Sequence, residues 1–284
     1  TPRAVLASAV FSDILPAANI QALPIDLFTP GSTPVEANFT EDGYRDDTII
    51  VEMRQQRLYD SDVYIAYVKI ATPSQLRTAV AGSKIGATST NHTSKISENY
   101  NGIVAINGDY FTKTKAGYIV RMGETYREKT SKNMDLLLID ELGDFHLLLR
   151  GHDAQKDGVA AFLSQHTIVN GFFFGPALVK DGEKLEIPEG YQFDPNQKNP
   201  RAGIAQLDTL TYALVVVNGR TDQSAGVTMA EFADVMAQLG AKQAYNLDGG
   251  NSATLAFHGQ VYNDKPQAER SVTDIIYFAS AIDE

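Results

Sequence analysis

The sequence contains no cysteine, few histidines and no long apolar run. Without cysteine the chain has no disulfide, no thiol nucleophile and no zinc site built on sulfur. The five histidines do not follow a spacing typical of metal ligands, so we expect neither a metal nor another cofactor. No apolar run approaches the roughly 20 residues that a membrane-spanning helix needs, so we expect no integral membrane segment.

Basic residues are also scarce relative to acidic ones. The chain has 24 Lys and Arg against 35 Asp and Glu, which gives a net charge of -11. A nucleic-acid-binding protein needs clustered basic residues to neutralise phosphates, so we expect no nucleic-acid partner. The sequence gives no indication of oligomeric state. The absence of cysteine fits an exported bacterial protein, and we expect an extracytoplasmic location, secreted or associated with the cell envelope.

The 284 residues and a hydrophobic content of 43% predict a packed globular core. Residues 1–45 are rich in Ala, Pro, Thr and Gly, and we predict that they form an N-terminal extension with a short helix over 4–15. Two alternatives stay open for this extension, which either lies on the main domain or forms a disordered stalk. Residues 46–284 are predicted to form one domain.

Alternating apolar residues predict two hairpins in the first half of the domain. The first has strands near 49–53 and 63–67, and the second has strands at Met134–Asp140 and Phe145–Leu149. The segment Thr72-Pro73-Ser74-Gln75 has the residues of a helix start, which predicts a helix continuing to Val80.

The last third of the chain predicts strands over 203–207, 212–217, 243–247, 252–258 and 274–279. A capping box at Thr228–Glu231 predicts one helix among them, ended by Gly240. Together these elements predict an α+β or mixed α/β fold, with a mixed, mostly antiparallel sheet and helices packed on it. A doubly wound nucleotide-binding fold is not favoured.

Three apolar strands run into a similar polar sequence. The segments are Asn107-Gly108-Asp109, Asn218-Gly219-Arg220 and the longer stretch from Asn246 to Ser252. Binding crevices form where strands end, although Asn-Gly pairs are also ordinary turn formers. Three such ends in one chain, with two acids and an arginine, favour a functional site.

The stretch NLDGGNSATL at 246–255 resembles the signature of the phosphodiester glycosidase family. Further motifs follow the order of that family, namely 107–111, 170–174, 200–204, 218–220, 229–239 and 269–270. The resemblance covers roughly residues 95–280 and does not extend to the first 45. Asn251 departs from the family pattern, because it stands where a third glycine is usual.

The resemblance implies a glycoside hydrolase that acts on glycosyl phosphodiesters. The expected reaction converts a sugar-1-phosphodiester, with an N-acetylglucosamine-like sugar, to free sugar and a phosphomonoester. Asp248 is the first candidate for nucleophile or base, with Glu269 and Asp109 as possible partners. Arginines could stabilise the phosphate by bidentate hydrogen bonds. The expected substrate-binding residues are Asn107, Arg201, Asn218, Arg220, Asn246, Gly249, Gly250, Ser252 and Arg270.

Two alternatives use the same fold. One is a non-hydrolytic protein that binds or helps to assemble an exopolysaccharide or a teichoic-acid-like polymer of the cell envelope. The other is a transferase that passes the sugar to an acceptor other than water. Both retain an arginine-lined pocket, and they differ from the hydrolase in turnover or in product.

Overall fold

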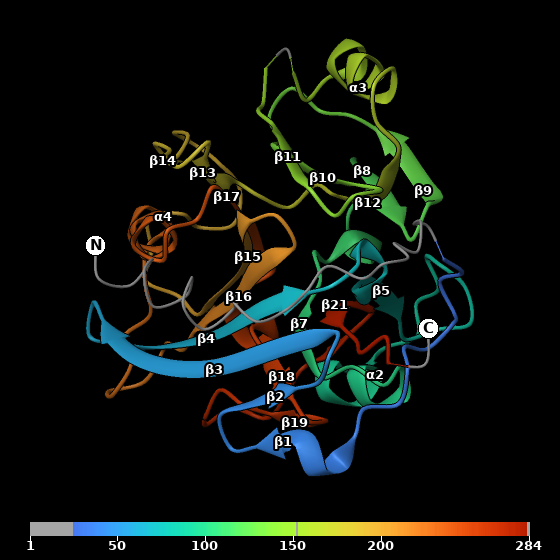
Figure 1. Ribbon diagram of the computed structural model, residues 1–284. Helices are drawn as coiled ribbons and strands as arrows, with labels where there is room; N and C mark the ends of the chain where they lie inside the picture. The colour runs from blue at the N-terminus through green and yellow to red at the C-terminus, as the bar shows by residue number, and fades with distance from the viewer. Residues whose placement is uncertain (1–24, 152, 283–284) are drawn as a thin grey trace.

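A computed structural model describes residues 25–151 and 153–282 of the chain (Figure 1). The helix predicted over 4–15 lies outside the described residues. Within the described part, the strands form three larger sheets and a two-stranded one. The two-stranded sheet pairs β6 (Asn91–His92) with β20 (Ser271–Val272).

The largest sheet has nine strands, and we call it the large sheet. In hydrogen-bonded order its strands are β1 (Phe39–Thr40), β2 (Gly43–Arg45), β3 (Ile49–Leu58), β4 (Ser61–Ile70), β16 (Thr211–Val217), β15 (Arg201–Asp208), β17 (Gln243–Leu247), β13 (Ala177–Lys180) and β14 (Glu183–Lys184). The central strand β16 is buried along its whole length. Its unbroken apolar sequence is therefore that of a strand covered on both faces.

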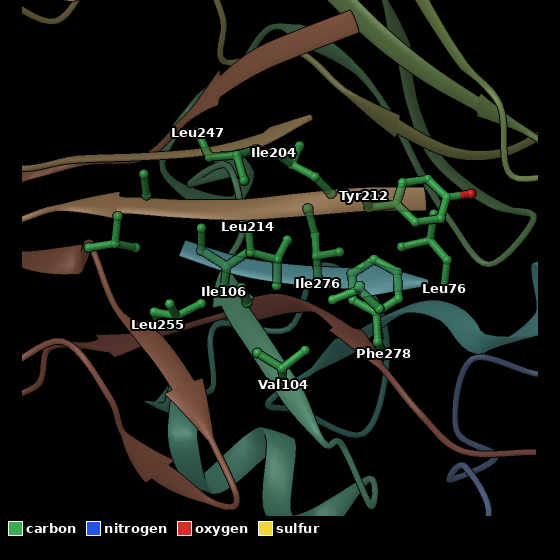
Figure 2. Packing of buried hydrophobic residues seen from close by; sticks show 14 of the residues in the cluster. Leu76, Val104, Ile106, Ile204, Tyr212, Leu214, Leu247, Leu255, Ile276 and Phe278 are labelled. Carbon is green, nitrogen blue, oxygen red and sulfur yellow. The ribbon is translucent and has the colours of Figure 1, made fainter. Parts of the chain in front are cut away.

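A five-stranded sheet, the facing sheet, packs against one face of the large sheet. Its strands are β19 (Gln260–Val261), β18 (Leu255–Phe257), β7 (Val104–Asn107), β21 (Asp274–Phe278) and β5 (Leu76–Val80). Figure 2 shows the core between the two sheets, where Ile204, Leu214 and Leu247 of the large sheet point toward Ile106, Leu255 and Ile276 of the facing sheet.

Helices cover the outer faces of these two sheets. Helix α4 (Met229–Gln238) buries Phe232 and Met236 against the far face of the large sheet. Helix α2 (Thr93–Asn99) packs Ile96 against the facing sheet. The body therefore has four layers, in the order helix, sheet, sheet, helix.

A second five-stranded sheet, the outlying sheet, lies beside this body at the top of Figure 1. Its strands are β11 (Phe145–Leu148), β10 (Leu136–Asp140), β12 (Ile168–Phe172), β8 (Gly117–Arg121) and β9 (Glu124–Lys129). One face contributes Leu137 and Ile139 to the main core, and the other packs with Phe162 of helix α3 (Lys156–Leu163) in a second core.

Most of the predicted elements are present. The two predicted hairpins correspond to β3–β4 and β10–β11. The strand over 212–217, the helix after Thr228 and the strand over 243–247 correspond to β16, α4 and β17. The capping box of α4 is formed, with Glu231 N donating to Thr228 Oγ1 at 3.2 Å. The fold is confirmed as dominated by sheets with a few helices on them.

Two details of the predicted fold are wrong. Every strand pairing found in the described residues is antiparallel, so the sheets are not mixed. The helix predicted from Thr72 to Val80 consists only of the 3-10 turn η2 (Pro73–Gln75), although its capping box is formed. Leu76–Val80 forms strand β5 instead, because pairing with β21 and complete burial outweigh the local start signal.

Residues 25–45, the described part of the predicted extension, lie on the body. Strand β2 pairs with β3 of the large sheet, and Ser32 forms a bridge with Ser280. None of the helices in residues 25–151 and 153–282 has the length and apolar character needed to cross a membrane.

Gly203 provides a test of how closely α4 packs on the large sheet. A Cβ atom at this position would lie 2.7 Å from Met236 Cε and 2.9 Å from the Tyr245 carbonyl oxygen. We expect Gly203→Ala to lower the free energy of unfolding by about 1–3 kcal/mol, measured by urea denaturation. In the control Gly171→Ala the nearest atoms lie at 3.4 Å, so the loss should be much smaller. Equal losses would contradict the close approach of α4.

Candidate active site

Two of the three predicted strand ends are joined by hydrogen bonds. Asn107 Nδ2, at the end of β7, donates to the Asp248 carbonyl oxygen at 2.7 Å. The Asp248 N–H donates to the Gly108 carbonyl at 3.3 Å. Asn107 is fully buried and also accepts from Thr254 N through Oδ1. It therefore fixes the backbone of the Asp248 loop instead of facing a substrate.

The third strand end, at Asn218-Gly219-Arg220, and the Asp248 loop both contact Pro200. The Gly250 N–H donates to the Pro200 carbonyl at 2.9 Å. A Cβ atom on Gly249 would lie 2.6 Å from that oxygen, and one on Gly219 would lie 2.8 Å from Pro200 N. Both glycines are thus required by close backbone approach.

A cleft of about 240 Å³ opens where these loops converge. It is lined by Phe174, Phe193, Asp194, Asn199, Arg201, Arg220, Asn246, Asp248, Gly249, Gly250, Asn251 and Arg270. The lining thus brings together three arginines and two aspartates, a local concentration of positive charge in a protein with net charge -11.

Arg201 is held rigidly in the wall of the cleft. Its guanidinium donates to the carbonyl oxygens of Val227 at 3.1 Å, Asp194 at 3.1 Å and Gln197 at 2.8 Å. Burial lowers the pKa of Arg201 to about 10, and the charge of Arg220 acts in the same direction. Arg201 therefore remains charged at neutral pH.

The other two arginines are more exposed. Arg220 donates to Asn199 Oδ1 at 3.1 Å and to Asn251 Oδ1 at 3.3 Å. Asn251, which replaces the usual third glycine, thus helps to orient this arginine. The Arg270 guanidinium lies 5.7 Å from the centre of the Tyr110 ring.

Asp248 has an acidity suited to proton transfer near neutral pH. Burial raises the pKa of its carboxyl to about 6, and the charge of Asp109 adds to this. The Ser252 hydroxyl and the charge of Arg270 act in the opposite direction. Asp248 is consequently mostly ionised at pH 7 but can accept a proton readily.

A smaller cavity of about 50 Å³ adjoins the cleft, since Asp248 and Arg270 line both spaces. Its walls include Tyr110, Ser252 and Asp274. Tyr110 has a left-handed backbone conformation with φ of 63°, as do Phe193 and Arg220 in the larger cleft. Such strained residues are common at functional sites.

A fully buried ion cluster lies behind the smaller cavity. Arg121 Nη2 donates to Asp109 at 2.7 Å, and Arg121 Nε donates to Asp274 at 3.0 Å. Burial raises the pKa of Asp109, against the effect of Arg121. Burial likewise raises the pKa of Asp274 to about 7, although Arg121 opposes it. Asp109 is thus a buried neighbour of Asp248, outside both cavities.

Of the remaining predicted site residues, Asn246 lines the cleft, whereas Glu269 and Asn218 line neither space. Both oxygens of Glu269 accept from Ser94, the first from its N–H at 2.9 Å and the second from its hydroxyl at 2.7 Å. Glu269 lines neither cavity and anchors the start of α2. Asn218 also lines neither, and its Oδ1 accepts from Asn263 at 3.0 Å. Asn246 does line the cleft, and its buried Oδ1 has no partner among the described residues.

The family comparison agrees with this geometry. A profile of the phosphodiester glycosidases matches residues 100–279, more than half of the chain. The chain belongs to the phosphodiester glycosidase family. The resemblance inferred from the sequence motifs is thereby confirmed.

The chain is distant from its individual relatives. It is 33% identical over 108 residues to the SPbeta prophage-derived uncharacterized protein YomE of Bacillus subtilis strain 168. That match covers 38% of this chain and spans only 17% of the relative.

Two solved structures share the fold. The catalytic domain of zebrafish N-acetylglucosamine-1-phosphodiester alpha-N-acetylglucosaminidase, auto-inhibited by its pro-peptide, has a TM-score of 0.63 at 15% identity, covering 94% of this chain and 97% of that one. A hypothetical protein from Synechocystis has a TM-score of 0.64 at 19% identity, covering 82% of this chain and 62% of that one.

Sequence reasoning missed several residues of the site. Arg121 and Asp274 carry no local motif, and only the pairing of β21 with β7 brings Asp274 to Asp109. Phe174 and Phe193 form a parallel stack in the cleft wall, with ring centres 4.3 Å apart. The aromatic clusters around these two were visible in the sequence, but nothing local predicted that they would meet.

Asp248→Asn should change how stability depends on pH. Because the folded-state pKa of about 6 lies above the usual 3.8, the folded protein retains this proton to higher pH than the unfolded chain does. The wild type therefore loses stability as the pH rises through this range, and the variant does not. Between about pH 4 and pH 8, the stability of the variant relative to the wild type, measured by urea unfolding, should rise by roughly 2–3 kcal/mol.

Asp208→Asn is the matched control for this titration. Asp208 is exposed, and a backbone hydrogen bond from Thr209 lowers its pKa. Its replacement should therefore bring no relative gain at high pH. If the stability difference between wild type and Asp248→Asn were the same at both pH values, the raised pKa of Asp248 would be wrong.

Proposed function

We propose that the chain hydrolyses a glycosyl phosphodiester to the free sugar and a phosphomonoester. The observation that carries this proposal is that Asp248, with a pKa of about 6, shares a cleft with Arg201, Arg220 and Arg270. A carboxylate beside a cluster of cations matches what the reaction needs, because positive charge develops on the sugar and negative charge on the leaving phosphate.

The arginines fit the leaving group. A phosphomonoester is a stable anion, so its departure needs charge stabilisation more than protonation. Arg201 is already oriented by three carbonyl oxygens, which reduces the cost of ordering it when a phosphate binds. Arg220 and Arg270 complete the positive face of the cleft.

Asp248 would act at the anomeric carbon of the sugar, either as a base or as a nucleophile. As a base, its carboxylate takes a proton from water while the water oxygen bonds to the anomeric carbon. The bond between that carbon and the phosphate oxygen breaks, and the phosphomonoester leaves with the electron pair. As a nucleophile, Asp248 would bond to the carbon first and be released by water afterwards. The buried Asp109 raises the pKa of Asp248, so we assign it to electrostatic support.

An N-acetylhexosamine is the sugar that we propose. The 50 Å³ cavity beside Asp248 includes the apolar side chain of Val272 and the methyl-bearing Thr112 in its walls, and it has room for an acetyl-sized substituent. The unpaired Asn246 Oδ1 could accept a hydrogen bond from a sugar hydroxyl. The name of the zebrafish protein with this fold also includes N-acetylglucosamine, although 15% identity supports the fold alone.

Turnover tests the role of Asp248 directly. With the methyl diester of alpha-N-acetylglucosamine-1-phosphate as substrate, proton NMR should show free sugar formed by the wild type. Asp248→Asn should lower the rate at least about a thousandfold, because it cannot act as base or nucleophile. Glu269→Gln should retain most of the rate, since Glu269 lies at the start of α2. Turnover by a folded Asp248→Asn would exclude this role.

Arg270→Ala tests the cationic face. Loss of a charged hydrogen-bond donor should lower kcat/KM by about tenfold to a hundredfold. Because Arg270 holds the pKa of Asp248 down, the acidic limb of the rate profile should also move to higher pH. A lower rate with an unshifted profile would mean that Arg270 does not act on Asp248.

The two alternatives give different products in the same assay. Saturable binding of the diester without free sugar would favour a protein that binds a cell-envelope polymer. Sugar transferred to an added alcohol would favour a transferase. An extracytoplasmic location belongs to all three readings and stays a prediction.

A further inference from the structure

The face of the outlying sheet that packs with α3 carries three potential metal ligands. His146 on β11 lies opposite Leu138, two residues before Asp140 on β10. Asp140 in turn lies opposite Ile168 on β12, two residues after His166. Since side chains alternate between faces, Asp140 and His146 lie on the same face. His166 precedes β12, and its ring lies beside Asp140 there.

The ligand atoms of these residues lie close together. His146 Nε2 is 2.7 Å from Asp140 Oδ2, and His166 Nδ1 is 3.7 Å from the same oxygen. Each residue has one ligand atom within 4.8 Å of those of the other two. Zinc bonds of about 2.0–2.2 Å at tetrahedral angles separate neighbouring ligand atoms by about 3.3 Å. The two measured separations lie on either side of this value.

The surrounding contacts leave the ligand atoms available. Asp140 Oδ1 accepts from the N–H groups of Leu142 at 2.9 Å and Asp144 at 3.0 Å, so Oδ2 is left for the histidines. Phe162 of α3 packs against both imidazoles, with ring centres 4.9 Å from His146 and 4.8 Å from His166. The rings are thus oriented by packing.

We propose that Asp140, His146 and His166 bind a divalent transition-metal ion, with zinc as the best match. Two imidazoles and one carboxylate are a ligand set that zinc favours, and the fourth position would be taken by water. The Asp140 side chain is 3% exposed while the two histidine side chains are 29% and 34% exposed, so an ion can enter from solvent. This is the one such group found in residues 25–151 and 153–282.

A bound ion would cross-link the β10–β11 hairpin to the segment that connects α3 with β12. Asp140 and His146 belong to one hairpin, while His166 lies between α3 and β12. An ion bound by all three would join the hairpin to the segment after α3. Binding to the folded state alone would then raise the melting temperature with metal concentration. None of these residues lines the cleft or the cavity at Asp248.

Calorimetric titration with zinc tests the proposal. The untagged full chain, stripped with a chelator, should bind one ion saturably and show a higher melting temperature. Cobalt in the same site should give the visible absorption of a tetrahedral complex. His146→Ala and His166→Ala should each lower the zinc affinity at least about tenfold, because each removes a ligand.

His258→Ala is the matched control. His258 Nε2 lies 2.9 Å from a Glu36 carboxylate oxygen but belongs to no group of three ligands. Its replacement should leave zinc affinity unchanged. Asp140→Asn keeps the Oδ1 acceptor of the turn, so it should fold normally and bind zinc weakly. Absence of saturable binding by the wild type, or equal affinity in the wild type and a folded His166→Ala, would overturn the proposal.

Discussion

The buried side chain of Arg121 joins the outlying sheet to the facing sheet and holds the two carboxyl groups that lie nearest to Asp248 in the interior. It lies at the end of β8 and binds Asp109 and Asp274, both of which follow or begin strands of the facing sheet. Taking such charges out of water costs several kcal/mol per ion, so the contacts must be nearly complete. The Gly171 carbonyl accepts from Arg121 at 2.6 Å, and the Phe172 ring lies 4.2 Å away.

Two carboxyl groups share this single guanidinium, and the excess of negative charge affects Asp248. The charge of Asp109 raises the pKa of both Asp248 and Asp274. The raised pKa of Asp248 thus comes mainly from burial, with a smaller contribution from Asp109 of this cluster, and the cluster's Asp274 lines the smaller cavity. On the opposite side, three arginines make the cleft attractive to an anion. Asp248 thus lies between buried carboxyl groups and a cleft lined by three arginines, which is the charge arrangement that the proposed reaction would need.

Local signals predicted the elements that depend on local interactions. The capping box at Thr228 started α4, and alternation gave the β3–β4 hairpin. The strand ends at Asn107 and Asn246 also converge as their shared pattern indicated. Leu76–Val80 shows the limit, because its strand exists through pairing with β21, about 200 residues later. Glu269 shows another limit: sequence order placed an acid beside Arg270, but its carboxylate binds the start of α2.

The same limit explains why the histidine cluster was not foreseen. Metal-ligand motifs are recognised by short spacings on one element, whereas Asp140 and His146 lie on two paired strands and His166 lies in the connection between α3 and β12. Strand β12 takes part in both polar groups of the outlying sheet, since Gly171 binds Arg121 and Ile168 lies opposite Asp140. The two polar groups differ in how far their side chains are exposed to solvent. The side chains of the Arg121 cluster are closed to solvent, while the two histidine side chains are partly exposed, as the proposed metal site requires.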